Sequence, residues 1–119
     1  MRVAFLNPMF GKDFTKSARW FARSRGRVQR HPDYFCTCAG VVEAAGHEIY
    51  FLDAQAKNMP TEIAIQKLKA FAPDMVVYQA TTPSIYADIE AARLWPSHRT
   101  GSARTLLRRA TNDARALAE

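Results

Sequence analysis

Two apolar stretches of the chain end in polar residues, and these ends carry the clearest chemistry in the sequence. Residues 1–6 end at Asn7-Pro8, and residues 74–78 are followed by a second polar stop made of Thr81, Thr82, Pro83 and Ser84. Three hydroxyls and the free N–H groups of a helix start would form a polar cradle for amides, carbonyls or phosphate. A plain helix cap explains the same hydroxyls equally well, because Ser and Thr are common before helices.

Other chemistry-bearing residues form no recognisable constellation. None of the histidines, which are His31, His47 and His98, falls in a metal or nucleophile motif, and the first strand is not followed by a glycine-rich phosphate loop. Cys36 and Cys38 are two positions apart in a predicted helix, so no disulfide is expected between them. We interpret both as packing residues rather than metal ligands, and we expect a reducing, cytoplasmic setting.

Composition places the chain among small globular domains. It has 119 residues, of which 48% are hydrophobic and 24% charged, and a formal net charge of +6. No apolar stretch approaches the ~20 residues of a membrane span, so neither a membrane segment nor a signal peptide is expected. Positive charge gathers at residues 12–30 and 93–119. Such clusters can serve nucleic acid or another anionic partner, although a solvated basic loop is the commoner explanation.

Alternating strand and helix patterns predict the elements that position the two polar stops. Strands are expected at residues 2–6, 47–52 and 74–78, and helices at 32–45, 60–71 and 83–94. A β-α-β-α-β-α order requires parallel strands with right-handed crossovers. We therefore predict an α/β fold, a three-layer Rossmann or flavodoxin-like sheet of strand order 2-1-3. In that order the ends of the first and third strands meet at the switch point, where ligands bind.

The first two predicted helices also have an expected inward face. In the first it comprises Phe35, Cys38, Val41, Val42 and Ala45, with Pro32 opening the helix and Gly46 ending it. The second is expected to bury Ile63, Ala64, Ile65, Leu68 and Phe71, and the third helix is expected to continue through Ile85, Ile89 and Ala92. Residues 8–31 form a long basic and aromatic connection, which at that length predicts a functional or disordered segment.

The pattern stops after Leu94. The next residues are polar and turn-like where a fourth strand is expected, and residues 103–118 indicate a separate Arg/Ala-rich helix. We therefore divide the chain into an α/β unit at 1–94 and a basic tail at 95–119. On this pattern we expect a sheet that is cut short, with exposed edges that allow a homo-oligomer.

The ordered set of segments resembles the N-terminal cobalamin-binding domain of B12-dependent radical SAM enzymes. Over residues 1–94 the matching segments are 3–8, Phe14 with 17–20, 39–49, 52–54, 71–77 and 81–84. The resemblance implies a Rossmann-like domain that holds cobalamin against the carboxyl edge of its sheet, without a histidine ligand to the cobalt, since D-x-H-x-x-G is absent. It implies these cofactor-binding residues: Asn7, Pro8, Arg19, Trp20, Asp53, Thr81, Thr82, Pro83 and Ser84.

The family's later strand, its glycine-rich turn and its radical SAM barrel have no counterpart beyond Leu94, and Cys36-Thr37-Cys38 cannot replace the C-x-x-x-C-x-x-C iron-sulfur motif. We therefore hypothesise a truncated module whose native reading frame is lost near residues 94–95. The leading function is a cobalamin-binding module with no catalysis of its own, which would serve a radical SAM domain absent from this chain. The alternative is a basic module for nucleic acid or an anionic partner; a generic flavodoxin-like signalling domain ranks last, because the clustered acids of a receiver site are missing.

Overall fold

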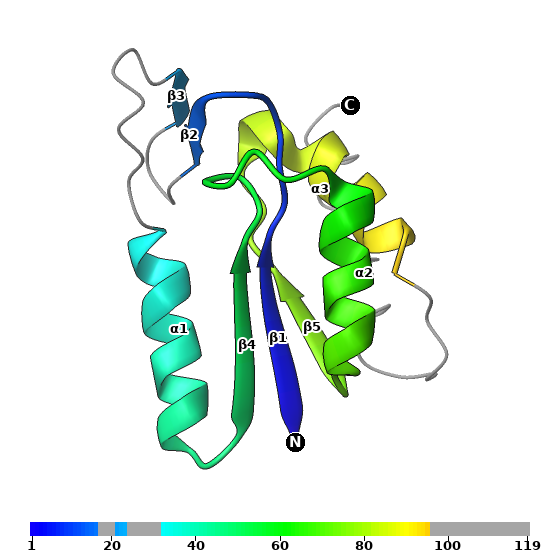
Figure 1. Ribbon diagram of the computed structural model, residues 1–119. Helices are drawn as coiled ribbons and strands as arrows, with labels where there is room; N and C mark the ends of the chain where they lie inside the picture. The colour runs from blue at the N-terminus through cyan, green and yellow to red at the C-terminus, as the bar shows by residue number, and fades with distance from the viewer. Residues whose placement is uncertain (17–20, 24–31, 96–119) are drawn as a thin grey trace, which may run out of the picture.

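A three-stranded parallel sheet with helices on both faces forms the body of the computed structural model, which describes residues 1–16, 21–23 and 32–95 (Figure 1). The strands are β1 (Arg2–Asn7), β4 (Glu48–Asp53) and β5 (Met75–Tyr78), in the order β4-β1-β5. The predicted α/β class and the 2-1-3 strand order are thus confirmed. The predictions that concern Arg19, Trp20 and the tail from residue 96 onward lie outside the described residues.

β1 is the central strand and pairs in parallel with both neighbours. Val3 lies beside Ile49 and Met75, and the ladder toward β4 ends with Asn7 beside Asp53. Residues 3–7 of β1 are all buried, which explains why this strand is apolar without alternation. All three strands therefore end at one edge, which lies toward the top of Figure 1.

One face of the sheet is covered by α1 (Asp33–Ala44). Phe35 packs against Phe5 with ring centroids 5.3 Å apart, and against Phe51 at the same centroid distance. Val3 and Ala39 complete the buried part of this cluster. Three aromatic rings from three elements thus set the orientation of α1, because offset and edge contacts between rings add to the burial of their apolar area.

The opposite face is covered by α2 (Thr61–Phe71). Ala64, Ile65 and Leu68 of this helix pack with Ala4, Leu6, Leu52 and Val76 of the sheet. A short 3-10 turn η1 (Thr82–Ser84) and α3 (Ile85–Arg93) follow β5, and Trp95 packs against the same core cluster. Helices before and after β5 therefore lie on this face, whereas α1 lies on the other.

The predicted inward face of α1 was wrong at three positions. Cys38, Val41 and Ala45 are exposed, with Val41 at 66%, and Ala39 takes the buried position that the prediction gave to Cys38. Both cysteines are exposed, so their interpretation as packing residues is wrong as well. In α2 Ile63 is exposed, whereas Ala64, Ile65 and Leu68 are buried as predicted. In α3 the buried positions are Asp88 and Ala91, and Ile85, Ile89 and Ala92 are half-buried.

Helix ends follow local backbone chemistry. Gly46 adopts φ +89° directly after the cap of α1, as its predicted role as a left-handed stop requires. Pro32 precedes the first helical residue rather than being part of the helix. α2 ends with Ala72 in the left-handed conformation, although alanine carries a Cβ, and Pro73 then prevents the helix from continuing.

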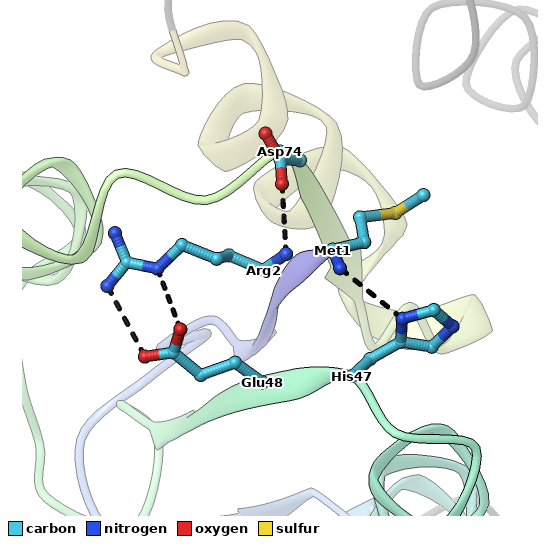
Figure 2. A network of polar contacts seen from close by, with 5 residues as sticks. All are labelled: Met1, Arg2, His47, Glu48 and Asp74. Carbon is cyan, nitrogen blue, oxygen red and sulfur yellow. Dashed lines mark hydrogen bonds and ion pairs between the residues drawn. The ribbon is translucent and has the colours of Figure 1, made fainter.

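At the amino edge of the sheet, polar contacts tie the three strand starts together (Figure 2). The Arg2 backbone N–H donates to Asp74 Oδ2 at 2.9 Å, and the Arg2 guanidinium contacts the Glu48 carboxylate at 3.1 Å. The same guanidinium lies 4.3 Å from the centre of the Phe71 ring. Met1 N lies 3.5 Å from His47 Nδ1. This network therefore holds β1, β4 and β5 in register at the edge remote from the predicted site.

The long connection between β1 and α1 contains a feature that the sequence did not predict. Two short strands, β2 (Phe14–Lys16) and β3 (Phe21–Arg23), pair as an antiparallel hairpin beside the carboxyl edge of the main sheet (Figure 1). No helix among the described residues is long and apolar enough to cross a membrane.

Candidate functional site

Asn7 and Asp53 form the centre of the carboxyl edge. They end the neighbouring strands β1 and β4 and lie side by side in the ladder. Asn7 Nδ2 donates to Asp53 Oδ1 at 2.9 Å, and the Ala56 backbone N–H donates to the same oxygen at 3.0 Å. This carboxylate oxygen therefore accepts two N–H donors, one from the end of β1 and one from the loop after β4.

The carboxamide oxygen of Asn7 lacks a hydrogen-bond partner among the described residues, and the residue is 1% exposed. Buried polar atoms without partners are rare, since each forfeits its hydration without compensation. An acceptor without a donor thus lies at the end of the central strand, where the predicted ligand site was placed.

β5 supplies the other side of the switch point. The Gln79 backbone N–H donates to Leu6 O at 3.0 Å, so the chain after β5 begins beside Asn7. The chain after β1 leads to α1 on one face of the sheet. The chain after β5 leads to η1 and α3, which lie toward the other face. Tyr78 packs on the α2 face with its hydroxyl buried and unpartnered among the described residues, and burial raises the pKa of this phenol above its usual value.

The predicted hydroxyl cradle is organised around a carboxylate. Ser84 Oγ donates to Asp88 Oδ2 at 2.7 Å, and the Thr81 backbone N–H donates to the same oxygen at 3.3 Å. Thr81 Oγ1 lies 2.6 Å from Ser84 Oγ. Both Ser84 and Asp88 are buried. Two of the three predicted hydroxyls are therefore engaged within the protein, that of Thr81 by Ser84 and that of Ser84 by Asp88. The Asp88 carboxylate disfavours an anion beside Ser84.

Thr82 and Pro83 remain accessible. Both are exposed at the start of η1, next to the strand end of β5. Pro8 is buried beside Asn7 on β1. Asn7, Pro8 and Asp53 thus lie together at the carboxyl ends of β1 and β4, and Thr82 and Pro83 follow β5 at the same edge.

Gln55 is the site residue that the sequence reasoning missed. Its buried amide receives the Phe10 N–H at 2.7 Å and donates to Gly11 O at 2.7 Å and Phe14 O at 3.0 Å. Asn58 makes a second link of this kind, accepting the Asp13 N–H at 3.0 Å. The loop after β4 therefore holds the loop after β1. A polar residue between Ala54 and Ala56, directly after a strand, was the available signal.

The start of α1 faces the same edge. Partial desolvation of the largely exposed Cys36 raises the pKa of its thiol, and the carboxylates of Asp53 and Asp33 raise it further. The charge of Asp53 thus acts on the thiol in the first turn of α1. At the remote edge, His47 precedes β4 and thus cannot reach a ligand held beside Asn7. The described residues contain no group of three His, Cys, Asp or Glu side chains arranged to hold a metal ion.

Comparison with protein-family models, with curated proteins and with solved structures finds no match to this chain. Evidence for a function of this chain therefore comes from the geometry of the carboxyl edge and from the sequence resemblance.

Proposed function

We propose that the chain is a non-catalytic cobalamin-binding module, a Rossmann-like or flavodoxin-like domain that holds its ligand across the carboxyl edge of the sheet. The parallel order β4-β1-β5, with helices on opposite faces, supports a ligand site at the switch point between β1 and β5. The resemblance of residues 1–94 to cobalamin-binding domains supports the identity of the ligand. The unpartnered Asn7 carboxamide oxygen is the observation that carries the proposal.

Cobalamin fits this acceptor in its chemistry. The corrin ring carries primary amides on its periphery, and their N–H groups are the donors that a carbonyl oxygen such as Asn7 Oδ1 lacks. Asn7 and Pro8 would contact the corrin periphery, with Asp53 behind them. The ligand's cobalt supplies any methyl-transfer or radical chemistry when bound, and this chain's residues bind and orient the ligand.

The phosphate of the nucleotide tail fits less well at Ser84, because that hydroxyl already donates to Asp88. The exposed Thr82 and Pro83 are better placed to contact the tail. The resemblance implies that no protein histidine binds the cobalt, so this edge need not supply one. The module would present its ligand to a radical SAM domain absent from this chain, in the cytoplasm.

Thermal unfolding with and without hydroxocobalamin tests the proposal. A ligand that binds only the folded chain raises its stability, by ~2.7 kcal/mol at a free concentration 100 times the Kd. We expect a cooperative circular dichroism melt whose midpoint rises with hydroxocobalamin concentration. A cooperative melt that does not shift, or no cooperative melt at all, would reject cobalamin binding by this chain.

The same experiment addresses the basic alternative. Single-stranded DNA in place of hydroxocobalamin should leave the midpoint unchanged at 0.15 M salt if the ligand is cobalamin. Stabilisation by DNA that declines steeply with salt, without any cobalamin effect, would favour a nucleic-acid module instead. Most of the basic cluster at 12–30 lies outside the described residues, so no observed geometry favours this alternative.

A further inference from the structure

We infer that Asn7 is the residue that selects a ligand carrying an uncharged primary amide, whose N–H it accepts at its carboxamide oxygen. Asp53 acts as a positioning residue that fixes which end of the Asn7 amide faces the ligand. This inference rests on the proposed function and adds to it the chemical group that is recognised. It is carried by the contacts at the ends of β1 and β4.

The orientation of the Asn7 amide follows from its neighbour. An ionised carboxylate only accepts hydrogen bonds, so the Asn7 nitrogen must be the atom that faces Asp53 Oδ1 at 2.9 Å. Asp53 is itself held by the Ala56 N–H at 3.0 Å, which limits its freedom to turn away. The Asn7 oxygen is then the end of the amide that is left without a donor among the described residues.

The surroundings favour a neutral donor over a charged one. The Asp53 carboxylate behind Asn7 would repel a ligand carboxylate, which in addition has no N–H to offer. An ammonium group would lose its hydration at a residue that is 1% exposed, at a large free-energy cost. A primary amide avoids both penalties and offers two N–H donors.

The decisive probe is a set of ligands that differ by one group. Hydroxocobalamin is compared with its derivatives in which a single propionamide has been hydrolysed to a propionate. Binding of each ligand to the unaltered chain is followed by the shift of the melting midpoint. We expect one derivative to bind about tenfold more weakly than hydroxocobalamin. Its propionate cannot donate to the buried Asn7 oxygen and is repelled by the Asp53 carboxylate. Equal affinity for all the derivatives and the parent would overturn the inference.

A variant identifies the residue that is responsible. Asn7→Leu has nearly the same shape but no acceptor, so it should bind the parent and the sensitive derivative with affinities that differ less than about twofold. The matched control is Gln66→Leu, which removes an amide from an exposed position on α2 and should keep the full discrimination. Discrimination that survives in Asn7→Leu would overturn the assignment to Asn7.

Cobalamin binding and amide selection by Asn7 can be refuted separately. If hydroxocobalamin itself does not shift the melting midpoint of the unaltered chain, the proposed function fails and the inference fails with it. If hydroxocobalamin binds but the derivatives bind equally well, only the inference fails. The comparison of ligands on the unaltered chain does not depend on whether Asn7→Leu folds.

Discussion

Asn7 donates its amide hydrogen to Asp53 across the ends of two neighbouring parallel strands, with 2.9 Å between Nδ2 and Oδ1. The two residues are 46 positions apart in the chain and become neighbours only because β1 and β4 pair in register. The contact thus depends on the correct alignment of the entire strand pair. A one-residue slip of β4 against β1 would turn the Asp53 side chain to the other face of the sheet.

The first prediction concerns Gln55, which joins the two loops at this edge. Gln55→Leu keeps the volume but removes the partners of Phe10 N, Gly11 O and Phe14 O. We expect a loss of about 2–4 kcal/mol in the free energy of unfolding, since three part-buried hydrogen bonds to the loop after β1 are lost. Urea unfolding followed by circular dichroism measures it.

A matched control separates this effect from the substitution itself. Gln66→Leu makes the same chemical change at an exposed position of α2, and there the expected change is within about 0.5 kcal/mol. Equal stability of the two variants would show that the Gln55 hydrogen bonds do not support the loop after β1.

The second prediction distinguishes a structural role of Ser84 from a ligand-binding one. Ser84→Ala removes the hydroxyl that donates to the buried Asp88 carboxylate at 2.7 Å. A hydrogen bond to a charged group contributes about 1.5–3 kcal/mol, so the free energy of unfolding should fall by that amount. Hydroxocobalamin affinity of the folded chain should change less than about twofold.

Thr82→Ala is the comparison for Ser84→Ala, because Thr82 is exposed at the same turn. Its substitution should leave the free energy of unfolding nearly unchanged. A large affinity loss in Ser84→Ala without loss of stability would instead return Ser84 to the ligand site.

The sheet and its strand order could be predicted because their signals are local and strong. Each strand is a short apolar run, and the intervening helices impose parallel pairing. The face of α1 could not be predicted in the same way. Phe35, Ala39 and Val42 form one apolar stripe at helical spacing, and Tyr34, Cys38 and Val41 form another. The choice is made by the Phe35 ring against Phe5 and Phe51, which are remote in sequence.

The contacts of the candidate site also divide into local ones that could be predicted and ones remote in sequence that could not. The Ser84–Asp88 pair lies at the i, i+4 spacing of a helix, so its hydrogen bond could have been foreseen from the sequence. The links from Gln55 to residues 10–14 span 41–45 positions and depend on how two loops meet above the sheet. The chemistry of Asn7 likewise depends on β4, because Asp53 determines which end of its amide is left without a partner.

The third prediction concerns the amino edge of the sheet. Glu48→Gln removes an exposed ion pair with Arg2, and exposed pairs contribute little, so the change should stay within about 0.5 kcal/mol. Arg2→Ala also removes the guanidinium 4.3 Å from the Phe71 ring centre, and should cost about 1 kcal/mol. Urea unfolding in low and high salt checks both. A larger effect of Glu48→Gln than of Arg2→Ala would contradict this account.

The fourth prediction uses the Cys36 thiol as a reporter of Asp53. Burial is the largest cause of its raised pKa, followed by the Asp53 charge and then by that of Asp33. Asp53→Asn removes the second cause, so the pKa should move down toward its ordinary value of 9.0 while staying above it. The pH dependence of iodoacetamide labelling measures this in a Cys38→Ser background, because only the thiolate reacts.

The sign of the accompanying stability effect follows from linkage. A raised pKa means that the folded chain holds the Cys36 proton more tightly than the unfolded chain does. Its contribution to stability is therefore complete below pH 9.0 and decreases as the pH rises through the folded pKa. Asp53→Asn should reduce this alkaline loss, whereas Glu62→Gln, on the exposed surface of α2, should leave it and the labelling midpoint unchanged. An unmoved midpoint in Asp53→Asn would show that the Asp53 charge does not act on the Cys36 thiol in solution.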